Sequence, residues 1–135
     1  MAETLRLHIV TPDETVLNED VEMVTLPGIE GDMGVYPHHE HLITQIVPGE
    51  IIVTNRGQER SLAVGEGLVE VTADRVEIVT NMAIAAEHID EARVEEARAR
   101  AAARLREKLS DEEIASTNAA LARSLAQLQV KRRRR

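Results

Sequence analysis

The chain has 135 residues, the length of one ordinary domain or of one domain with an appendage. It contains no cysteine, which excludes disulfides and thiolate metal sites. Aromatic residues make up 1% of the sequence, so the core must be built from aliphatic side chains. Val and Ile fit well on the pleated surface of a sheet, and the composition therefore favours β-structure.

The net charge of −8 is distributed unevenly along the sequence. Residues 1–87 carry 4 Lys/Arg and 16 Asp/Glu, a net charge of −12, whereas residues 88–135 carry 12 Lys/Arg and 8 Asp/Glu, a net charge of +4. The opposite signs suggest two functional parts. The acidic first part argues against nucleic acid as a partner, because phosphate groups would repel it.

Signals for secretion and for membrane insertion are missing from the sequence. The N-terminus has no basic start followed by an apolar run, and no apolar stretch approaches the roughly 18 residues that a transmembrane helix needs. We therefore expect a soluble protein that is not itself inserted into a membrane.

Residues 1–87 are predicted to form an antiparallel β-sandwich. Short runs of alternating apolar and polar residues follow one another, with turn signals and no helical pattern between them, which is typical of an all-β domain. Asn55–Gly57 and the Ala73–Asp74 pair predict tight turns, whereas the glycine-rich stretch Gly28–Gly34 is expected to form an irregular loop. The strand-like runs cover residues 5–10, 21–26, 42–47, 51–54, 61–64, 69–72 and 75–78.

Residues 88–135 are predicted to form two helices that fold back as an antiparallel hairpin, so the expected fold class is α+β. The stretch Asp90–Leu109 lacks Gly and Pro and is rich in good helix formers. Asp90 is a suitable N-cap for the first helix. Ser110 and Glu113 form the Ser-x-x-Glu pattern of a capping box, which opens the second helix.

The packing face of the hairpin is expected to be alanine-rich on the first helix and leucine-rich on the second. Burial of apolar surface stabilises a contact by roughly 25 cal/mol per Å2, and alanine buries little such surface. The hairpin should therefore be able to detach without unfolding the sandwich. The five cations Lys131–Arg135 are expected to fray and to be solvated, because they repel one another. The expected face of the second helix consists of Ile114, Leu121, Leu125 and Leu128.

Neither a catalytic nor a metal site is expected. His38, His39 and His41 lie close in sequence, but a zinc site usually needs four ligands and adjacent histidines rarely converge. The glycines of residues 28–34 lack the Gly-Lys-Ser/Thr ending of a phosphate loop. No cysteine is available as a nucleophile, and the serines lack the surroundings of a nucleophile elbow.

Three segments together resemble one protein family. Leu26–Ile43 contains Leu-Pro-Gly, Gly-x-x-Gly, Val-x-Pro, a histidine and a Leu-Ile pair. Gly65–Val79 and the Ile-Asp-x-x-Arg pattern at residues 89–93 follow it in the order of the family. Over essentially its whole length, the sequence is similar to the epsilon subunit of F-type ATP synthases.

The resemblance implies a non-catalytic rotor subunit of a proton-translocating complex. It implies a sandwich (1–87) that is seated on the gamma subunit and touches the c-ring, and a hairpin (88–135) that is either compact or extended. In the extended state the hairpin is expected to enter the catalytic alpha/beta head and to block ATP hydrolysis. The implied location is peripheral, at the cytoplasmic face of the cell membrane.

The resemblance also places a weak regulatory ATP contact on the hairpin, with no required cofactor. Val94 replaces the alanine that is usual in the family, and Ile84 stands where tight ATP binders have an acidic residue. A weak affinity for ATP is therefore expected. The matching residues are Ile89, Asp90, Arg93 and Arg100.

Two interpretations of these matching residues compete. Arg93 and Arg100 are two turns apart on one helix face, from which guanidinium groups can meet phosphates. Alternatively, Asp90 caps the helix and Arg93 forms a surface ion pair.

Two sets of docking residues follow from the resemblance. Arg123 and the cations of Lys131–Arg135 are expected to meet acidic loops of the catalytic beta subunits when the hairpin extends, a contact that salt should weaken. The set on and beside the rotor-facing loops consists of Glu30, Gly31, Asp32, Met33 and His39.

Two other functions stay open on the sequence. One is a free-standing, ligand-binding β-sandwich whose helical hairpin forms a dimer. The other is a metal-dependent enzyme of a small β-barrel type that uses the histidine cluster.

Overall fold

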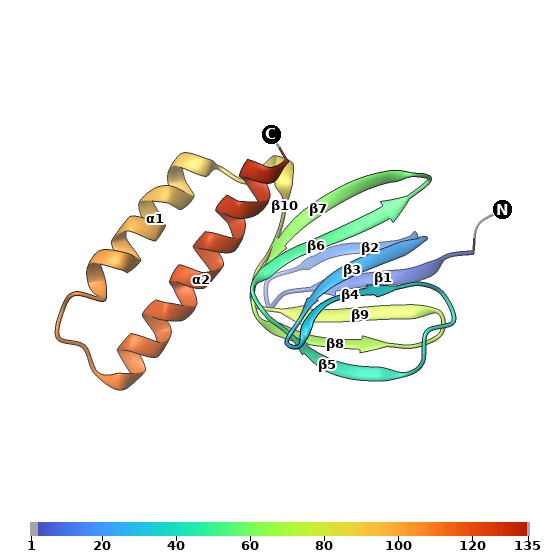
Figure 1. Cartoon of the computed structure of the whole chain (residues 1–135), viewed down its shortest axis with the longest axis horizontal. Helices are drawn as coiled ribbons and strands as arrows, with labels where there is room; N and C mark the ends of the chain where they lie inside the picture. The colour runs from blue at the N-terminus through green and yellow to red at the C-terminus, as the bar shows by residue number, and fades with distance from the viewer. Residues whose placement is uncertain (1–2, 135) are drawn as a thin grey trace.

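The structure, a computed structural model, describes residues 3–134, which form a β-sandwich followed by two helices, as Figure 1 shows. This is the expected α+β fold class. A short 3-10 turn, η1 (Ala86–His88), leads into α1 (Glu91–Arg104) and α2 (Asp111–Arg133). The ten strands are β1 (Leu5–Val10), β2 (Thr15–Val21), β3 (Met23–Gly28), β4 (Gly31–Val35), β5 (Leu42–Ile46), β6 (Gly49–Asn55), β7 (Gln58–Val64), β8 (Gly67–Val71), β9 (Arg75–Thr80) and β10 (Ala83–Ala85).

The strands form one continuous sheet that folds over on itself, in the order β10-β7-β6-β3-β5-β8-β9-β1-β2, with β4 paired to β3. The pairs are antiparallel, as expected, apart from β1 and β9, which run parallel. A parallel pair needs a long connection, and the strands between β1 and β9 supply it. The N-terminal hairpin β1–β2 thus closes the sandwich beside its last long strand.

The core follows from the alternation of the sequence. In β1, Leu5, Leu7 and Ile9 are buried, and in β9 Val76 and Ile78 face the same core. The register pairs Leu7 with Val76 and Ile9 with Ile78, so side chains of neighbouring strands meet in rows. The buried residues of this core are all Leu, Ile or Val, as the composition requires.

The glycine-rich stretch is not the irregular loop that the sequence suggests. It forms the end of β3, a two-residue turn and most of β4, with Gly28 paired to Gly31. Gly31 has a φ of 124°, which other residues rarely adopt, and a Cβ on Gly28 would lie 2.8 Å from the Gly31 carbonyl oxygen. The glycines therefore permit a tight hairpin where an irregular connection was expected.

Besides β4, the short strand β10 and the longer strand β2 were not predicted from the sequence. β2 lies at the edge of the sheet, where one side of the strand stays unpaired and polar residues are common. Its consecutive polar residues Asn18, Glu19 and Asp20 hide the alternation of apolar and polar positions. The run predicted at residues 21–26 is divided, since β2 ends at Val21 and β3 begins at Met23.

Both predicted tight turns are confirmed. Arg56 and Gly57 have φ values of 54° and 76°, the left-handed pair that a two-residue connection between β6 and β7 needs. At the other turn, the Thr72 N–H donates to the Arg75 carbonyl at 2.8 Å.

The second helix begins as predicted, but the first ends earlier than predicted. Ser110 Oγ accepts from the Glu113 N–H at 3.2 Å, and the Ser110 N–H donates to the Glu113 carboxylate at 3.1 Å, which completes the capping box. The backbone of Ser110 is extended, and the chain must reverse direction before this residue. α1 therefore stops at Arg104, and residues 105–110 form the connection.

The buried face of α2 differs from the predicted leucine face. Leu128 is buried, but Ile114 and Leu125 are 40% and 48% exposed. The C-terminal part of α2 packs on α1 and on the sheet at once, whereas the tip of the hairpin projects away from the sandwich (Figure 1). Two faces of α2 are therefore covered near its end. The buried residues are Thr117, Ser124, Ala126, Leu128 and Val130.

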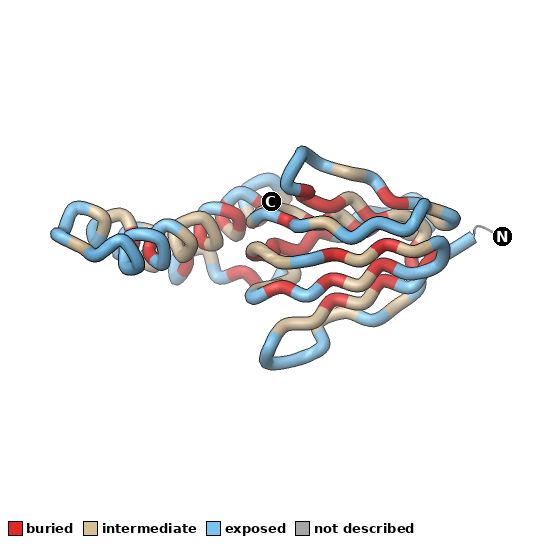
Figure 2. Tube along the Cα trace, turned by 90° about the horizontal axis from the view of Figure 1, so that it is seen from below, coloured by how far each residue is buried: buried red, intermediate tan, exposed pale blue. Residues whose placement is uncertain are grey.

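A second apolar cluster, here called the junction cluster, joins the hairpin to the sandwich. Its members come from β7, η1 and the residue after it, the start of α1 and the end of α2. Figure 2 shows that buried positions are dense in the strands and sparse toward the tip of the hairpin. The junction cluster consists of Ala63, Ala86, Ile89, Val94, Leu128 and Val130.

Neighbouring residues of β9 provide a test of the core. Ile78→Ala should lower the free energy of unfolding by about 2–5 kcal/mol, because it removes a fully buried side chain and leaves a cavity. Val79→Ala should cost less than about 1 kcal/mol, because Val79 is 54% exposed. Urea denaturation of both variants measures the difference. Equal losses would contradict the described register.

Candidate functional site

A groove of about 300 Å3 opens where the hairpin leaves the sandwich. Asp90 caps α1, and its side chain accepts a hydrogen bond from the Arg93 N–H at 3.2 Å. The cap expected at Asp90 is therefore confirmed. The groove is lined by Ile84, His88, Asp90, Arg93, Val94, Ala97, Ser124 and Gln127.

The structure separates the four residues that the resemblance assigns to ATP. Asp90 and Arg93 line the groove, but Ile89 is buried in the junction cluster and Arg100 lies further along α1, outside the groove. Within residues 3–134, the guanidinium of Arg93 makes no hydrogen bond or ion pair, so the expected surface ion pair is not formed. This cation is free to meet an anion in the groove.

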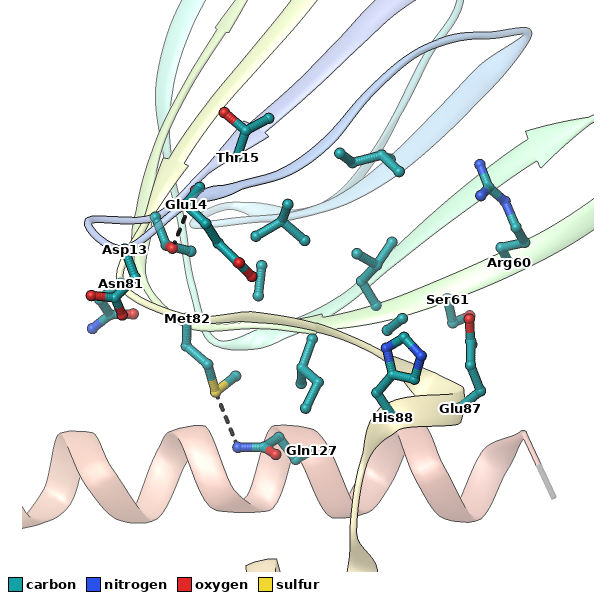
Figure 3. A pocket seen from close by; sticks show the side chains of 17 residues that line it. Asp13, Glu14, Thr15, Arg60, Ser61, Asn81, Met82, Glu87, His88 and Gln127 are labelled. Atoms are coloured by element: carbon teal, nitrogen blue, oxygen red, sulfur yellow. Dashed lines mark hydrogen bonds between the residues drawn. The ribbon is translucent and has the colours of Figure 1, made fainter.

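A wider cleft of about 780 Å3 lies between β2 and the segment of β10 and η1, as Figure 3 shows. β2 and β10 are the two ends of the sheet, so the cleft marks the place where the sandwich is left open. On the α2 side, Gln127 Nε2 donates to Met82 Sδ at 3.1 Å. The charged residues on its walls are Asp13, Glu14, Arg60 and Glu87.

The rotor-facing residues fall into two groups. Glu30, Gly31 and Asp32 are exposed at the turn between β3 and β4, and Met33 is half-buried against the core. His39 lies beyond the opposite end of β4, where its Nδ1 is 2.7 Å from the Glu40 carbonyl oxygen. The structure therefore does not bring His39 together with the other four.

The three clustered histidines have separate environments. His38 pairs with Glu3 at 2.9 Å, and His41 pairs with Glu70 at 3.0 Å, from different elements. In the part of the chain that the structure describes, no group of three or more His, Asp or Glu side chains is arranged to hold a metal.

The C-terminal cations are not the solvated tail that their repulsion suggests. α2 continues to Arg133, and Arg132 pairs with Glu91 at 2.9 Å and with Glu95 at 3.1 Å. Cations are favoured at the C-terminus of a helix. In this chain, carboxylates of α1 and of the sheet also neutralise the arginines at the end of α2. Lys131 Nζ donates to the Ala86 carbonyl at 3.3 Å. Arg135 lies outside the described residues.

Arg133 and Arg134 bind the sandwich. Arg133 donates two hydrogen bonds to the Glu50 carboxylate, at 2.8 and 2.5 Å, and Arg134 donates to Ser61 Oγ at 2.6 Å. Burial raises the pKa of Glu50, but hydrogen bonds from Arg133 and Ser61 and the charges of both arginines outweigh it. The pKa of Glu50 is thus lowered below its ordinary value, and the carboxylate stays ionised.

Arg123, expected to meet a partner, is also engaged by the sandwich. It donates to the Glu66 carboxylate at 3.1 Å, and the Asn81 amide donates to the same oxygen. Its guanidinium is therefore available to another protein only when α2 moves away.

The sequence interpretation missed an exposed apolar row on the outer face of the sheet. Leu68 of β8 pairs with Val79 of β9, and Ile43 of β5 lies on the same face two residues before Gln45, the partner of Leu68. Ile43, Leu68 and Val79 are 63%, 54% and 54% exposed. The sequence holds a signal for it: Leu68 and Val79 each follow or precede a buried apolar residue directly, where an alternating strand would have a polar one.

The fold defines the class of the protein: a β-sandwich that carries a two-helix hairpin on one edge of its sheet. Two family models match, the β-sandwich domain of the ATP synthase delta/epsilon chain over residues 4–86 and its long α-helix domain over residues 87–132. The chain belongs to the delta/epsilon chain family of ATP synthases.

Individual relatives agree with this assignment. The chain is 40% identical to the ATP synthase epsilon chain of Herpetosiphon aurantiacus, over 97% of this chain and 96% of the relative. It is 41% identical to the epsilon chain of Dehalococcoides mccartyi, over 97% and 94%.

Solved structures share the fold. A chain in the cryo-EM structure of the Euglena gracilis mitochondrial ATP synthase, which holds F1 and the c-ring, matches with a TM-score of 0.78 and 26% identity, covering 93% of this chain and 79% of that one. A chain in the central stalk and c-ring of the Tetrahymena thermophila enzyme matches with a TM-score of 0.60 and 12% identity, covering 96% and 98%, and shows the fold alone. Among residues 3–134, no helix is long and apolar enough to cross a bilayer.

Proposed function

We propose that the protein is the epsilon subunit in the central stalk of an F-type ATP synthase. It couples the rotor to the proton-translocating c-ring and regulates ATP hydrolysis, without an active site of its own. The observation that carries this proposal is the likeness to epsilon chains over 97% of the chain, which spans sandwich and hairpin together. Its place is peripheral, at the cytoplasmic face of the cell membrane.

The sandwich docks on the gamma subunit through the exposed apolar row. Single exposed apolar residues are ordinary, but a row across three neighbouring strands is typical of an interaction surface. Glu70, which pairs with His41, lies directly opposite Ile43, and Glu77, which pairs with His8, lies opposite Glu70. Exposed apolar side chains beside charged ones on one face support a protein interface.

The turn between β3 and β4 reaches the c-ring. Its two glycine positions make a narrow hairpin that exposes the carboxylates of Glu30 and Asp32. The similar chain of the Euglena enzyme lies in an assembly that contains the c-ring, which supports this contact. His39 lies beyond the other end of β4 and therefore serves a separate contact.

A charge placed in the apolar row tests the gamma contact. Leu68→Asp should weaken binding to the gamma subunit by at least about tenfold, because an unpaired carboxylate would be buried in the interface. Leu125→Asp is the matched control, since Leu125 is also about half exposed but lies on the hairpin. Pull-down with purified gamma measures both. A stable homodimer without gamma binding would instead favour a free-standing, ligand-binding sandwich.

The hairpin inhibits ATP hydrolysis when it leaves the sandwich and enters the catalytic alpha/beta head. Its attachment through the small junction cluster supports this movement. The cations of α2, Arg123 among them, then become available to acidic loops of the head.

Removal of the hairpin tests the inhibition. In a complex reconstituted from the catalytic head and gamma, residues 1–87 should leave ATP hydrolysis faster than the full chain does, because the inhibiting helices are missing. Binding of residues 1–87 to gamma is the control for a folded sandwich. Equal rates, with gamma bound in both cases, would argue against inhibition by the hairpin.

The groove at the start of α1 is a weak regulatory site for ATP. Arg93, whose guanidinium is unpaired within the described residues, contacts the phosphates there, next to Gln127 and Ser124. Arg100 lies outside the groove, and Asp90 is engaged as the helix cap, so few groups remain for the ligand. The site therefore holds ATP weakly and favours the compact state.

Calorimetric titration measures this site. The chain should bind ATP with a dissociation constant in the millimolar range, about the strength that one or two charge-assisted contacts provide. Arg93→Gln should abolish the heat, while Arg106→Gln, a charge change in the connection between the helices, should leave it unchanged. The absence of heat at millimolar ATP in the unaltered chain would rule the site out.

A further inference from the structure

The apolar attachment of the hairpin is too limited to decide alone whether the hairpin stays docked. The junction cluster has six buried members, and two of them are alanines, which bury little area. Ile114 and Leu125 of α2 are exposed even in the docked state, and Figure 2 shows the tip of the hairpin away from the sandwich. Polar contacts between α2 and the sandwich therefore carry much of the attachment.

These polar contacts form a single stripe along α2. Arg123, Gln127 and Lys131 are spaced by four residues and Arg134 follows after three, which places them on one helix face. Each of them binds the sandwich or η1, through Glu66, Met82, the Ala86 carbonyl and Ser61 respectively. Arg133 joins the stripe at its C-terminal end.

The C-terminal end of the stripe is the most strongly held part. Arg133 binds both oxygens of Glu50, a bidentate geometry that is among the strongest ionic contacts in proteins. Arg134 lies 3.5 Å from the same carboxylate, 3.5 Å from Glu59 and 2.6 Å from Ser61 Oγ. Glu50 is the second residue of β6, and Glu59 and Ser61 lie on β7, so the three residues stand on paired strands.

Burial distinguishes this contact from an ordinary surface ion pair. The side chain of Glu50 is 19% exposed, whereas those of Arg104 and Glu113, an ion pair near the tip of the hairpin, are about half exposed. A carboxylate left unpaired in such half-buried surroundings is unfavourable. Undocking of α2 must therefore rehydrate Glu50 and separate it from the cations of the C-terminal segment.

We propose that Glu50, Glu59 and Ser61 form an ionic latch, which binds Arg133 and Arg134 and holds the hairpin on the sandwich without any ligand. The regulatory meaning of this ionic latch rests on the proposed function, but the latch itself is a property of the isolated chain. The same arginines cannot bind Glu50 and an acidic partner at once. The ionic latch therefore competes directly with any acidic surface that would capture the extended hairpin.

Hydrogen exchange on the full-length chain tests the ionic latch. Glu50→Gln keeps the shape of the side chain but removes its charge, and should speed exchange in the last turns of α2 by about tenfold, the effect of losing a charge-assisted hydrogen bond. Exchange in β8 and β9 should stay unchanged. Glu19→Gln is the matched control, because Glu19 pairs with Arg60 within the sandwich and does not contact α2.

Salt and a second variant complete the test. Raising salt from about 50 mM to about 500 mM should speed the same exchange in the unaltered chain and have much less effect in Glu50→Gln. Arg133→Gln should reproduce Glu50→Gln, and the double variant should add little, as expected for two partners of one contact. Arg133 is half exposed, so this variant keeps the test valid if Glu50→Gln does not fold.

Two outcomes overturn the ionic latch. One is equal exchange in α2 for Glu50→Gln and Glu19→Gln, and the other is faster exchange in the strands as well as in α2, which indicates general loss of stability. Either result leaves gamma binding, and so the proposed function, unaffected. Failure to bind gamma would overturn the proposed function and leave these exchange rates unchanged.

Discussion

The pairing of β1 with β9 is the contact on which the rest of the structure depends. It attaches the N-terminal hairpin to the last long strand of the sandwich and brings Leu7 and Ile9 onto Val76 and Ile78. Without it, the aliphatic core would be open along one side. Because the sheet closes there, its two remaining ends, β2 and β10, face each other across the wide cleft, and the β6–β7–β10 side is left for α2.

The uneven charge along the sequence is explained by contacts between the two parts of the structure. The acidic sandwich and the basic helices attract each other, and the contacts concentrate at the end of α2, where the arginines meet carboxylates of β6 and β7. The arrangement assigns each surface a different chemistry. The outer face of the sheet exposes the apolar side chains of Ile43, Leu68 and Val79, whereas the edge that receives the hairpin is acidic and occupied.

Much of the fold could be predicted from the sequence, because local patterns decide it. Alternation located most strands, the Asn55–Gly57 turn and the Ser110 capping box were predicted correctly, and the charge change separated strands from helices. Two of the misses depend on contact between distant segments: the parallel partner of β1 and the docking of Arg133 onto Glu50. The early end of α1 has a local cause, because the chain must reverse before the extended N-cap Ser110.

In the candidate sites, too, local features could be predicted from the sequence and those set by tertiary packing could not. Asp90 was recognised as a helix cap from its position alone, but which arginine would line the groove depends on how α1 packs against α2. The apolar row at Ile43, Leu68 and Val79 was visible as a break in the alternation, yet only the register places the three on one face.

The small size of the apolar junction cluster, beside the ionic contacts of the last turn of α2, also determines how docking responds to temperature. Separation of the hairpin wets little apolar surface, so the heat capacity change of that step is small beside that of unfolding the sandwich. The desolvation penalty of ion pairs falls as temperature rises. Warming is therefore expected to weaken the arginine contacts less than it weakens the packing of the sheet.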